Sequence, residues 1–297
     1  MASTIGLGEN ASLGGFRPFP PTSAWNTPID TLNVNSNSAN WIANCSPASQ
    51  SVLRLDFSMP YQVAPGSTPG MAPSAPCTYG CDPGPYRIPT NAIIEGTDAT
   101  HPNGQGDMHM IVVDRDNLLS YEVFAFVWDP GMTSFTGGSG VVWNLAIDDM
   151  HPHSGADAAG LPIFPGLIRS DELIDAQKIE HALRFTCTTT YKGYIAPANA
   201  SAGATTDPSF PPMGMRVRMK KDFDTSSYPA SLQPLFTALK KYGLLLADNG
   251  GANTPWFITG ADDPRLQQEL ANEWYVIRNV DVNVAMEVVD TGPVNPM

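Results

Sequence analysis

The segment 106–117 places an aspartate and a histidine two residues apart at the start of a strongly β-prone run. Asp107 and His109 would point to the same face of a strand, because side chains alternate between the two faces along it. A carboxylate beside an imidazole suits general acid–base catalysis or metal binding. The structural alternative is a histidine bonded to a loop, with Asp107 forming a turn.

Further carboxylates would join this pair if the neighbouring segments form adjacent strands. Glu95 ends the short β-prone segment 92–95, Asp114 ends the run 108–114, and Glu122 lies in the next run, 118–127. Of these three we take Glu95 as a candidate catalytic carboxylate beside Asp107.

Asp157 lies among small residues in the segment 154–162, where a ligand can approach the backbone closely. A carboxylate there could act as nucleophile, acid or base, and two carboxylates that face each other across a groove would make a glycosidase. The structural alternative is that Asp157 caps a turn. Asp171 and Glu172 are more typical of the first turn of a helix, where they complement its dipole.

Five residues are candidates for binding a substrate. His181 and Arg184 lie at a predicted helix-to-strand junction, where a guanidinium could clamp a carboxylate or a sugar hydroxyl; a structural salt bridge is the alternative for Arg184. Trp128 and Trp256 lie beside loops and could offer flat faces to sugar rings. Tyr121 could serve as the acid in a β-elimination of uronic acids.

A metal site is the weaker interpretation of the histidines. His151 and His153 would share one face of a strand, and His109 could complete a set of ligands. However, Pro152 between them favours an exposed loop. We therefore expect no cofactor, with a metal ion as the alternative.

The elements that must position these residues are mostly strands. Period-2 and β-branched runs predict strands at 92–95, 108–114, 118–127, 140–145, 182–189, 213–220, 244–247, 256–259 and 282–289. Helices are predicted at 171–181, 231–242 and 263–274. We therefore expect a mostly β, single-domain fold over 1–297, a jelly-roll-like β-sandwich or a barrel, with long Pro/Gly-rich loops and about three short helices.

Two segments of this domain are expected to lack regular structure. Residues 1–50 are predicted to form a polar N-terminal wrap. Residues 60–92 contain eight prolines and should form an ordered coil that is neither a central strand nor a helix.

Composition excludes several classes of function. The chain of 297 residues has a net charge of −13 and no basic stripe, which disfavours nucleic acid and anionic membrane surfaces as partners. No apolar run approaches the ~20 residues of a transmembrane helix. Walker, dinucleotide-binding, nucleophile-elbow and His-Glu-x-x-His motifs are absent.

Cysteine usage points to an oxidising compartment. Cys45, Cys77, Cys81 and Cys187 form an even set in Pro/Gly-rich loops, which predicts two disulfides. Three pairings are open; Cys77 and Cys81 could close a tight local loop and leave Cys45 with Cys187. The N-terminus has no basic start or apolar core, so we expect a secreted protein whose signal peptide has been removed.

Several phrases resemble a group of secreted microbial proteins, mostly uncharacterised, that are often found beside carbohydrate-active modules. These phrases are FPPTSAWN (19–26), GDMHMIVVDRDN (106–117), SGADAAGLP (154–162), HALRFT (181–186) and YGLLLADNG (242–250). The resemblance spans most of the chain and implies secretion and a single domain. It assigns no chemistry, and the His-Pro-His segment at 151–153 departs from the group.

Taken together, the residues predict a secreted carbohydrate-active enzyme, a glycoside hydrolase that cleaves a polysaccharide by acid–base catalysis. Asp157 with Asp107 or Glu95 would supply the carboxylates, and His109 would be positioned against them. A non-catalytic glycan-binding or cell-surface module is the first alternative. A metal-dependent enzyme or a polysaccharide lyase is the second. The expected partner is a polysaccharide or oligosaccharide.

Overall fold

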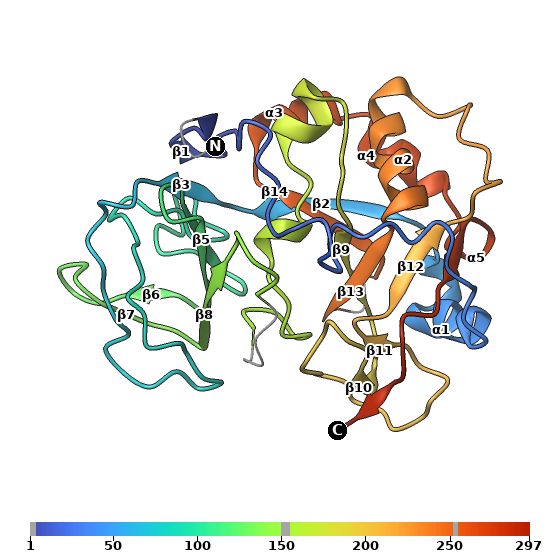
Figure 1. The fold of residues 1–297 in the computed structure, drawn as a ribbon, viewed down its shortest axis with the longest axis horizontal. Helices are drawn as coiled ribbons and strands as arrows, with labels where there is room; N and C mark the ends of the chain where they lie inside the picture. Colours follow the sequence, from blue (N-terminus) through green and yellow to red (C-terminus); the bar gives the residue numbers. More distant parts are fainter. Residues whose placement is uncertain (1–3, 150–154, 252–254) are drawn as a thin grey trace.

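The fold has two lobes, each built on a sheet, in the computed structural model, which describes residues 4–149, 155–251 and 255–297 (Figure 1). The first lobe contains a five-stranded sheet, and the second contains a six-stranded sheet with helices packed around it. The predicted mostly β, single-domain fold is confirmed, and none of the sheets in the described ranges closes into a barrel.

The first sheet is mostly antiparallel. Its order is β1 (Gly8–Glu9), β3 (Gln62–Ala64), β4 (Met110–Asp114), β5 (Leu119–Phe124) and β8 (Ser139–Asn144), and only the β3–β4 pair is parallel. A two-stranded ribbon of β6 (Val127–Trp128) and β7 (Phe135–Thr136) lies in the same lobe. Every residue of β4 is buried because both faces of the sheet are covered.

The second lobe holds the mixed six-stranded sheet. Its order is β15 (Met286–Val288), β12 (Arg216–Met219), β13 (Leu244–Asn249), β9 (Leu183–Cys187), β14 (Phe257–Ala261) and β2 (Arg54–Met59). The β13–β9 and β14–β2 pairs are parallel. A small sheet of β11 (Pro212–Met213), β10 (Tyr191–Tyr194) and β16 (Asn295–Pro296) lies beside it.

The helices of the described residues are short and belong to the second lobe. They are α1 (Ser38–Cys45), α2 (Gln233–Lys241), α3 (Pro264–Glu269), α4 (Glu273–Val276) and α5 (Val282–Ala285). Single 3₁₀ turns occur at Ala48–Gln50, Phe164–Gly166, Ala230–Leu232 and Ile277–Asn279, and a π turn at Asp171–Asp175. Within the described ranges, no helix combines the length and apolarity needed to cross a membrane.

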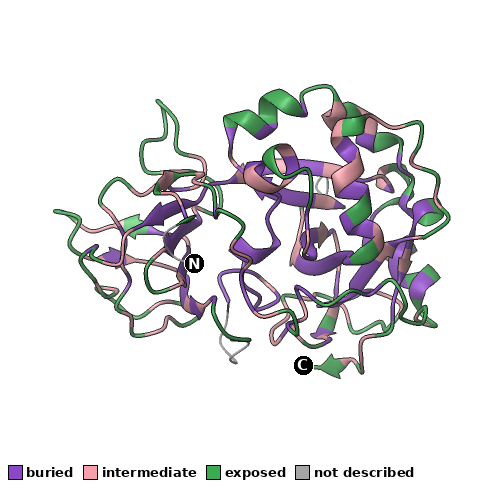
Figure 2. Cartoon of the chain, turned by 45° about the horizontal axis from the view of Figure 1, so that its top comes forward, coloured by how far each residue is buried: buried purple, intermediate pink, exposed green. Residues whose placement is uncertain are grey.

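One hydrophobic core spans both lobes. It includes Ile111 and Val113 from β4 together with Leu183 from β9 and Ile258 from β14. The alternate residues of β4, including Val112, contact a second, smaller cluster on the other face of the first sheet. Figure 2 shows buried strands in both lobes and exposed loops around them.

Strands β2 and β3 connect the two sheets directly. Only Pro60 and Tyr61 separate β2 in the six-stranded sheet from β3 in the five-stranded sheet, and the ribbon passes from one lobe to the other there (Figure 1). The prediction that 60–92 contains no inner strand was therefore wrong at Gln62–Ala64, where β3 lies between β1 and β4. The prolines flank this short strand and do not interrupt its ladder.

Several predicted elements have different boundaries or types. The predicted helix 171–181 contains a single π turn, and 263–274 contains two short helices, α3 and α4. The predicted strand 282–289 begins as helix α5, because the Asp281 side chain accepts a hydrogen bond from the Asn283 amide and caps it. Segment 92–95 forms only an isolated bridge, between Ile94 and Met110.

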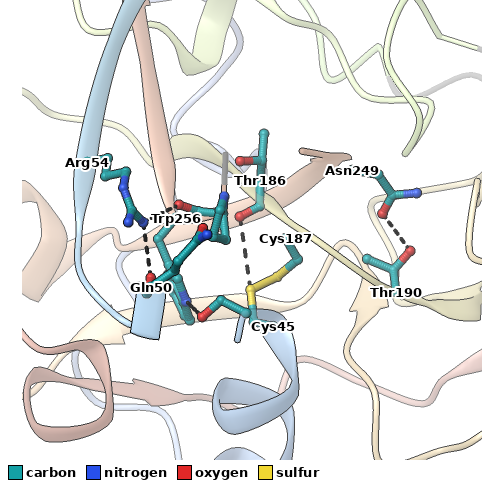
Figure 3. Close-up of a disulfide and its surroundings, with 10 residues drawn as sticks. Cys45, Gln50, Arg54, Thr186, Cys187, Thr190, Asn249 and Trp256 are labelled. Atoms are coloured by element: carbon teal, nitrogen blue, oxygen red, sulfur yellow. Dashed lines mark hydrogen bonds between the residues drawn. A yellow bond between two sulfur atoms is a disulfide. The ribbon is translucent and has the colours of Figure 1, made fainter. Parts of the chain in front are cut away.

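Two disulfides are present, and their pairing selects one of the three open arrangements. Cys45–Cys187 joins α1 to β9 (Figure 3), and Cys77–Cys81 closes a short loop in the first lobe. In the close-up, Trp256 lies next to the first disulfide, and its Nε1 donates a hydrogen bond to Ser46 Oγ at 3.2 Å.

Candidate functional site

A cavity of about 510 Å³ lies where loops of the two lobes meet. The first lobe contributes residues just before β4, at the end of β5 and at the start of β8. The second lobe contributes the loop after β10 and the end of β13. The lining residues are Tyr79, Asp107, His109, Phe124, Ser139, Gly155, Ala156, Asp157, Ala158, Ala200, Ser201, Ala202 and Asp248.

His109 and Glu95 form a buried pair at this cavity. His109 Nδ1 lies 2.6 Å from Glu95 Oε2, and the His109 amide donates to the same oxygen at 3.1 Å. The Glu95 amide donates to the His109 carbonyl at 2.8 Å, which holds the two segments side by side. The predicted proximity of Glu95 and His109 is therefore present, although Glu95 lies behind His109 and does not line the cavity.

Both ring nitrogens of His109 face acceptors. Nε2 lies 3.1 Å from the Ala156 carbonyl, and only a protonated nitrogen can donate there. Burial alone would lower the pKa of His109, but the hydrogen bond and the charge of Glu95 outweigh it and raise that pKa. Conversely, burial would raise the pKa of Glu95, and its bond to His109 lowers it. The pair therefore consists of an imidazolium and a carboxylate, and His109 also anchors the loop that contains Ala156.

Asp157 lies on that loop with its carboxylate enclosed. Its Oδ1 accepts hydrogen bonds from the Ala159 amide at 3.1 Å and the Leu161 amide at 2.8 Å. The side chain is 0% exposed, so only its backbone faces the cavity. Burial raises the pKa of Asp157 to about 7 despite the cation of Arg184, whose Nη2 lies 3.4 Å from Oδ2. These contacts are those of a turn cap.

Gly155 and Gly160 explain the small residues around Asp157. A Cβ atom on Gly155 would lie 2.8 Å from the Gly160 backbone, and Gly160 has a φ of +68°. The glycines therefore allow the loop to close tightly around Asp157, and it is Ala156 and Ala158 that line the cavity.

Arg184 and Asp248 connect the loop to the six-stranded sheet. Arg184 extends from β9, is 4% exposed, and contacts Asp248 Oδ2 at 3.8 Å as well as Asp157. The register of β13 against β9 shifts between Leu246 and Asp248. Irregularities of this kind redirect side chains near functional sites. Asp248 is the more accessible carboxylate, with 28% of its side chain exposed.

The buried charges around Arg184 do not balance. Burial raises the pKa of Asp248, an effect that Arg184 and His109 only partly offset. It also raises the pKa values of Asp56 and Glu122, both of which interact with Arg184. Arg184 is thus shared among several buried carboxyls, and its charge does not fully offset the effect of burial on their pKa values.

Asp107 is exposed at the cavity's opening and helps to raise the pKa of Asp248 through like charge. The prediction that Asp107 and His109 share one face of a strand was wrong, because neither residue belongs to a strand. Strand β4 begins only at Met110, and Met108 has a φ of +49°. Both side chains nevertheless line the same cavity because the chain turns at Met108.

Four predicted substrate-binding residues lie away from the cavity. His181 is buried, with Nε2 3.0 Å from Glu172 Oε2 and Nδ1 2.8 Å from the Ala182 carbonyl. Trp256 is fully buried and stacks on Phe185 at 5.0 Å, so it cannot offer a face to a sugar. The loop residues next to Trp256 in the sequence led us to expect an exposed ring, but the ring packs beside the Cys45–Cys187 disulfide.

The remaining two lie in the first lobe. Tyr121 is buried and its hydroxyl donates to Asp114 Oδ2 at 3.4 Å. Trp128 packs edge-on against Phe126 at 4.9 Å. Of the predicted substrate-binding residues, only Arg184 belongs to the site, and it lies beneath the cavity as a partner of carboxylates.

The metal interpretation gains no support from the described residues. His151 and His153 lie outside them. No group of three or more histidine, cysteine or acidic side chains among the described residues is arranged to hold a metal ion.

Among the lining residues that sequence reasoning missed, three bear a charge or an aromatic ring. Asp248 follows the apolar run 244–247, and a carboxylate at the end of a buried strand is a feature that could have identified it. Phe124 and Tyr79 form the aromatic part of the wall. Tyr79 could have been found as the only aromatic residue between the paired cysteines 77 and 81.

The arrangement provides two accessible carboxylates in different environments. Asp248 is partly buried with a raised pKa, and Asp107 is exposed. Two carboxyl groups in different environments are characteristic of acid–base sites. No protein-family model, curated protein or solved structure matches the chain.

Proposed function

We propose that the protein is a glycoside hydrolase that cleaves a polysaccharide at this cavity. The observation that carries the proposal is the meeting of Asp248 and Asp107 in one cavity, with Asp248 partly buried and Asp107 exposed. Glycosidic bond hydrolysis requires one protonated and one ionised carboxyl group on either side of the bond.

Asp248 is the proton donor in this proposal. Its raised pKa favours the protonated form, which delivers its proton to the glycosidic oxygen as the bond breaks. Asp107, as a carboxylate, attacks the anomeric carbon or takes a proton from the attacking water. Asp248 takes the role that the sequence suggested for Asp157, because the Asp157 carboxylate is 0% exposed and its lone pairs are used by the turn.

The other charged residues act by positioning. Arg184 contacts both Asp157 and Asp248 and fixes Asp248 relative to the loop. His109 holds the same loop through the Ala156 carbonyl, with Glu95 keeping its ring charged and oriented. A neutral sugar suits this cavity better than a uronate, because Asp107 and Asp248 would repel an anion.

The test is a panel of neutral and uronic polysaccharides, each incubated with and without EDTA. We follow new reducing ends and the ultraviolet absorbance of unsaturated uronates. Reducing ends without absorbance and without EDTA sensitivity are expected for a hydrolase. Asp248→Asn and Asp107→Asn should each lower turnover roughly a hundredfold or more. Asp222→Asn, an exposed aspartate outside the cavity lining, is the matched control.

Other outcomes would overturn the proposal in specific ways. Unsaturated products would identify a lyase, and loss of activity with EDTA would identify a metal-dependent enzyme. Unchanged turnover in Asp248→Asn would remove the assigned proton donor.

A glycan-binding module is the second candidate, because the aromatic wall of Tyr79 and Phe124 needs no catalysis to hold a sugar. Binding without new reducing ends for any polysaccharide of the panel would favour it over the hydrolase.

We also propose that the protein is secreted. The two disulfides support this, since such bonds persist in oxidising compartments. Mass spectrometry of the native protein under non-reducing conditions tests it: free thiols at all four cysteines would contradict secretion.

A further inference from the structure

Tyr79 combines high exposure with a place in the cavity wall. It is 65% exposed, among the largest exposures of any apolar or aromatic side chain described, and it lines the cavity beside Phe124. A single exposed aromatic residue is ordinary on protein surfaces. What distinguishes Tyr79 is how firmly its backbone is held.

The loop that presents Tyr79 is closed and fixed to the first sheet. The Cys77–Cys81 disulfide closes it over four residues of separation. The Tyr79 amide donates to the Gly138 carbonyl at 2.8 Å, and the Gly140 amide donates to the Gly80 carbonyl at 3.2 Å. These bonds attach the loop to the start of β8, whose Ser139 lines the same cavity.

The position of Tyr79 relative to the His109–Glu95 pair is also defined. Its ring centroid lies 6.4 Å from that of Phe124, and the Phe124 ring lies 5.6 Å from that of His109. The three rings therefore form a row that runs from the exposed loop to the buried His109–Glu95 pair. Such a row presents an apolar wall along the path by which a sugar chain would enter.

We propose that Tyr79 is the stacking platform of an outer sugar subsite, at which one pyranose ring of a neutral oligosaccharide lies with its C–H face against the phenol ring. This inference rests on the proposed function, since it extends the substrate beyond the sugars at the cleaved bond. Stacking suits this residue because a tyrosine offers a flat apolar face to the C–H groups of a sugar ring. The disulfide lowers the entropic cost of binding by fixing the platform before the sugar arrives.

The experiment measures binding separately from cleavage. The parent protein is Asp248→Asn, and the probes are cellohexaose, xylohexaose and mannohexaose, titrated by isothermal calorimetry. Tyr79→Ala should weaken the binding of the best probe roughly tenfold, which corresponds to about 1.4 kcal/mol. Tyr79→Trp should restore it. Tyr275→Ala, which removes a tyrosine of similar exposure outside the cavity lining, should have no effect.

A second variant tests the role of the loop. Replacing Cys77 and Cys81 by serine in the same parent keeps the ring and releases the loop. We expect a smaller loss of affinity than in Tyr79→Ala, with a less favourable binding entropy.

The outcomes separate this inference from the proposed hydrolase. Equal affinity of Tyr79→Ala and its parent would overturn the platform, even if the natural protein cleaves glycans. Failure of all three probes to bind would overturn it as well. Binding that depends on Tyr79, in a natural protein that cleaves nothing in the polysaccharide panel, would support the platform and overturn the hydrolase.

Discussion

The buried His109–Glu95 pair can be tested by removing one charge while keeping the shape. Glu95→Gln retains a side chain of the same size that can still accept a hydrogen bond from His109. It removes the carboxylate charge that raises the pKa of His109. Of the remaining influences, burial and the nearby Arg184 cation disfavour the imidazolium, and the smaller effect of the Asp248 charge favours it. We therefore expect the pKa of His109 to fall below 6.5 in the variant.

The expected loss of stability is large because both partners are shielded from water. The side chain of His109 is 7% exposed and that of Glu95 is 17% exposed, and their atoms lie 2.6 Å apart. Removing one partner of a buried ion pair costs about 3 kcal/mol or more. Surface pairs of the same kind contribute much less than this.

The loss should depend on pH in a defined way. Because the folded-state pKa of His109 is raised, its contribution is complete below pH 6.5 and is lost as the pH rises through the raised value. Because the folded-state pKa of Glu95 is lowered, its contribution is present above pH 4.5 and is lost as the pH falls through the lowered value. The difference between the natural protein and Glu95→Gln should therefore be greatest between pH 4.5 and 6.5.

Two assays measure these effects. Urea unfolding across the pH range gives the difference in free energy of unfolding, and NMR titration of the histidine ring protons gives the pKa of His109. His109→Ala identifies its resonance among the five histidines. A His109 that titrates above 6.5 in Glu95→Gln, or a stability difference that does not change with pH, would refute the assignment of the pair.

Three further predictions concern the framework of the site. The pKa of Asp157 is about 7, so its contribution to stability is present below pH 3.8 and is lost as the pH rises towards 7. Asp157→Asn should remove a fall of about 4 kcal/mol from the pH dependence of urea unfolding, and an unchanged slope would argue against a raised pKa. Gly160→Ala places a side chain at a φ of +68° and should cost about 1 kcal/mol, measurable as a lower Tm; an unaltered Tm would mean that the loop adapts. Replacing Cys45 and Cys187 by serine opens a link over 142 residues and should cost about 4 kcal/mol in urea unfolding, whereas breaking the short loop's disulfide should cost less.

Strong local patterns predicted their elements well. Strands β4 and β8 lie within one residue or two of the predicted runs, and so does α2, whose Leu235, Phe236 and Leu239 form a buried stripe. The helix ends before Gly243, whose φ is +67°. In these segments the residue pattern and the tertiary contacts favour the same structure.

Elements that depend on distant partners were missed. Strand β2 alternates Leu55, Phe57 and Met59 as buried residues, yet it forms by pairing with β14, about two hundred residues later. Strand β3 is only three residues long and exists because β1 and β4 flank it. No local pattern can show which remote segment will complete a sheet.

The site was only partly predictable, because some of its residues are close in sequence and others are distant. Asp107, His109 and Glu95 are close in sequence, and their types and spacing indicated a common location. The approach of Arg184 to Asp157 and Asp248 depends on contacts between separate lobes and loops. The spacing of these residues along the chain therefore does not predict their contact.

The two-residue connection between β2 and β3 limits how the molecule can move. The connection through Pro60 and Tyr61 is too short to act as a flexible linker between the sheets. The Tyr61 ring also packs against Phe164, with the ring centroids 5.1 Å apart, within the core that both lobes share. A hinge between the lobes would have to pull this core apart, which is far costlier than bending a free linker. In the proposed hydrolase, a sugar chain would therefore enter a cavity of nearly constant width. Turnover in such an enzyme would be set by chemistry or by sliding of the chain, and not by opening and closing of lobes.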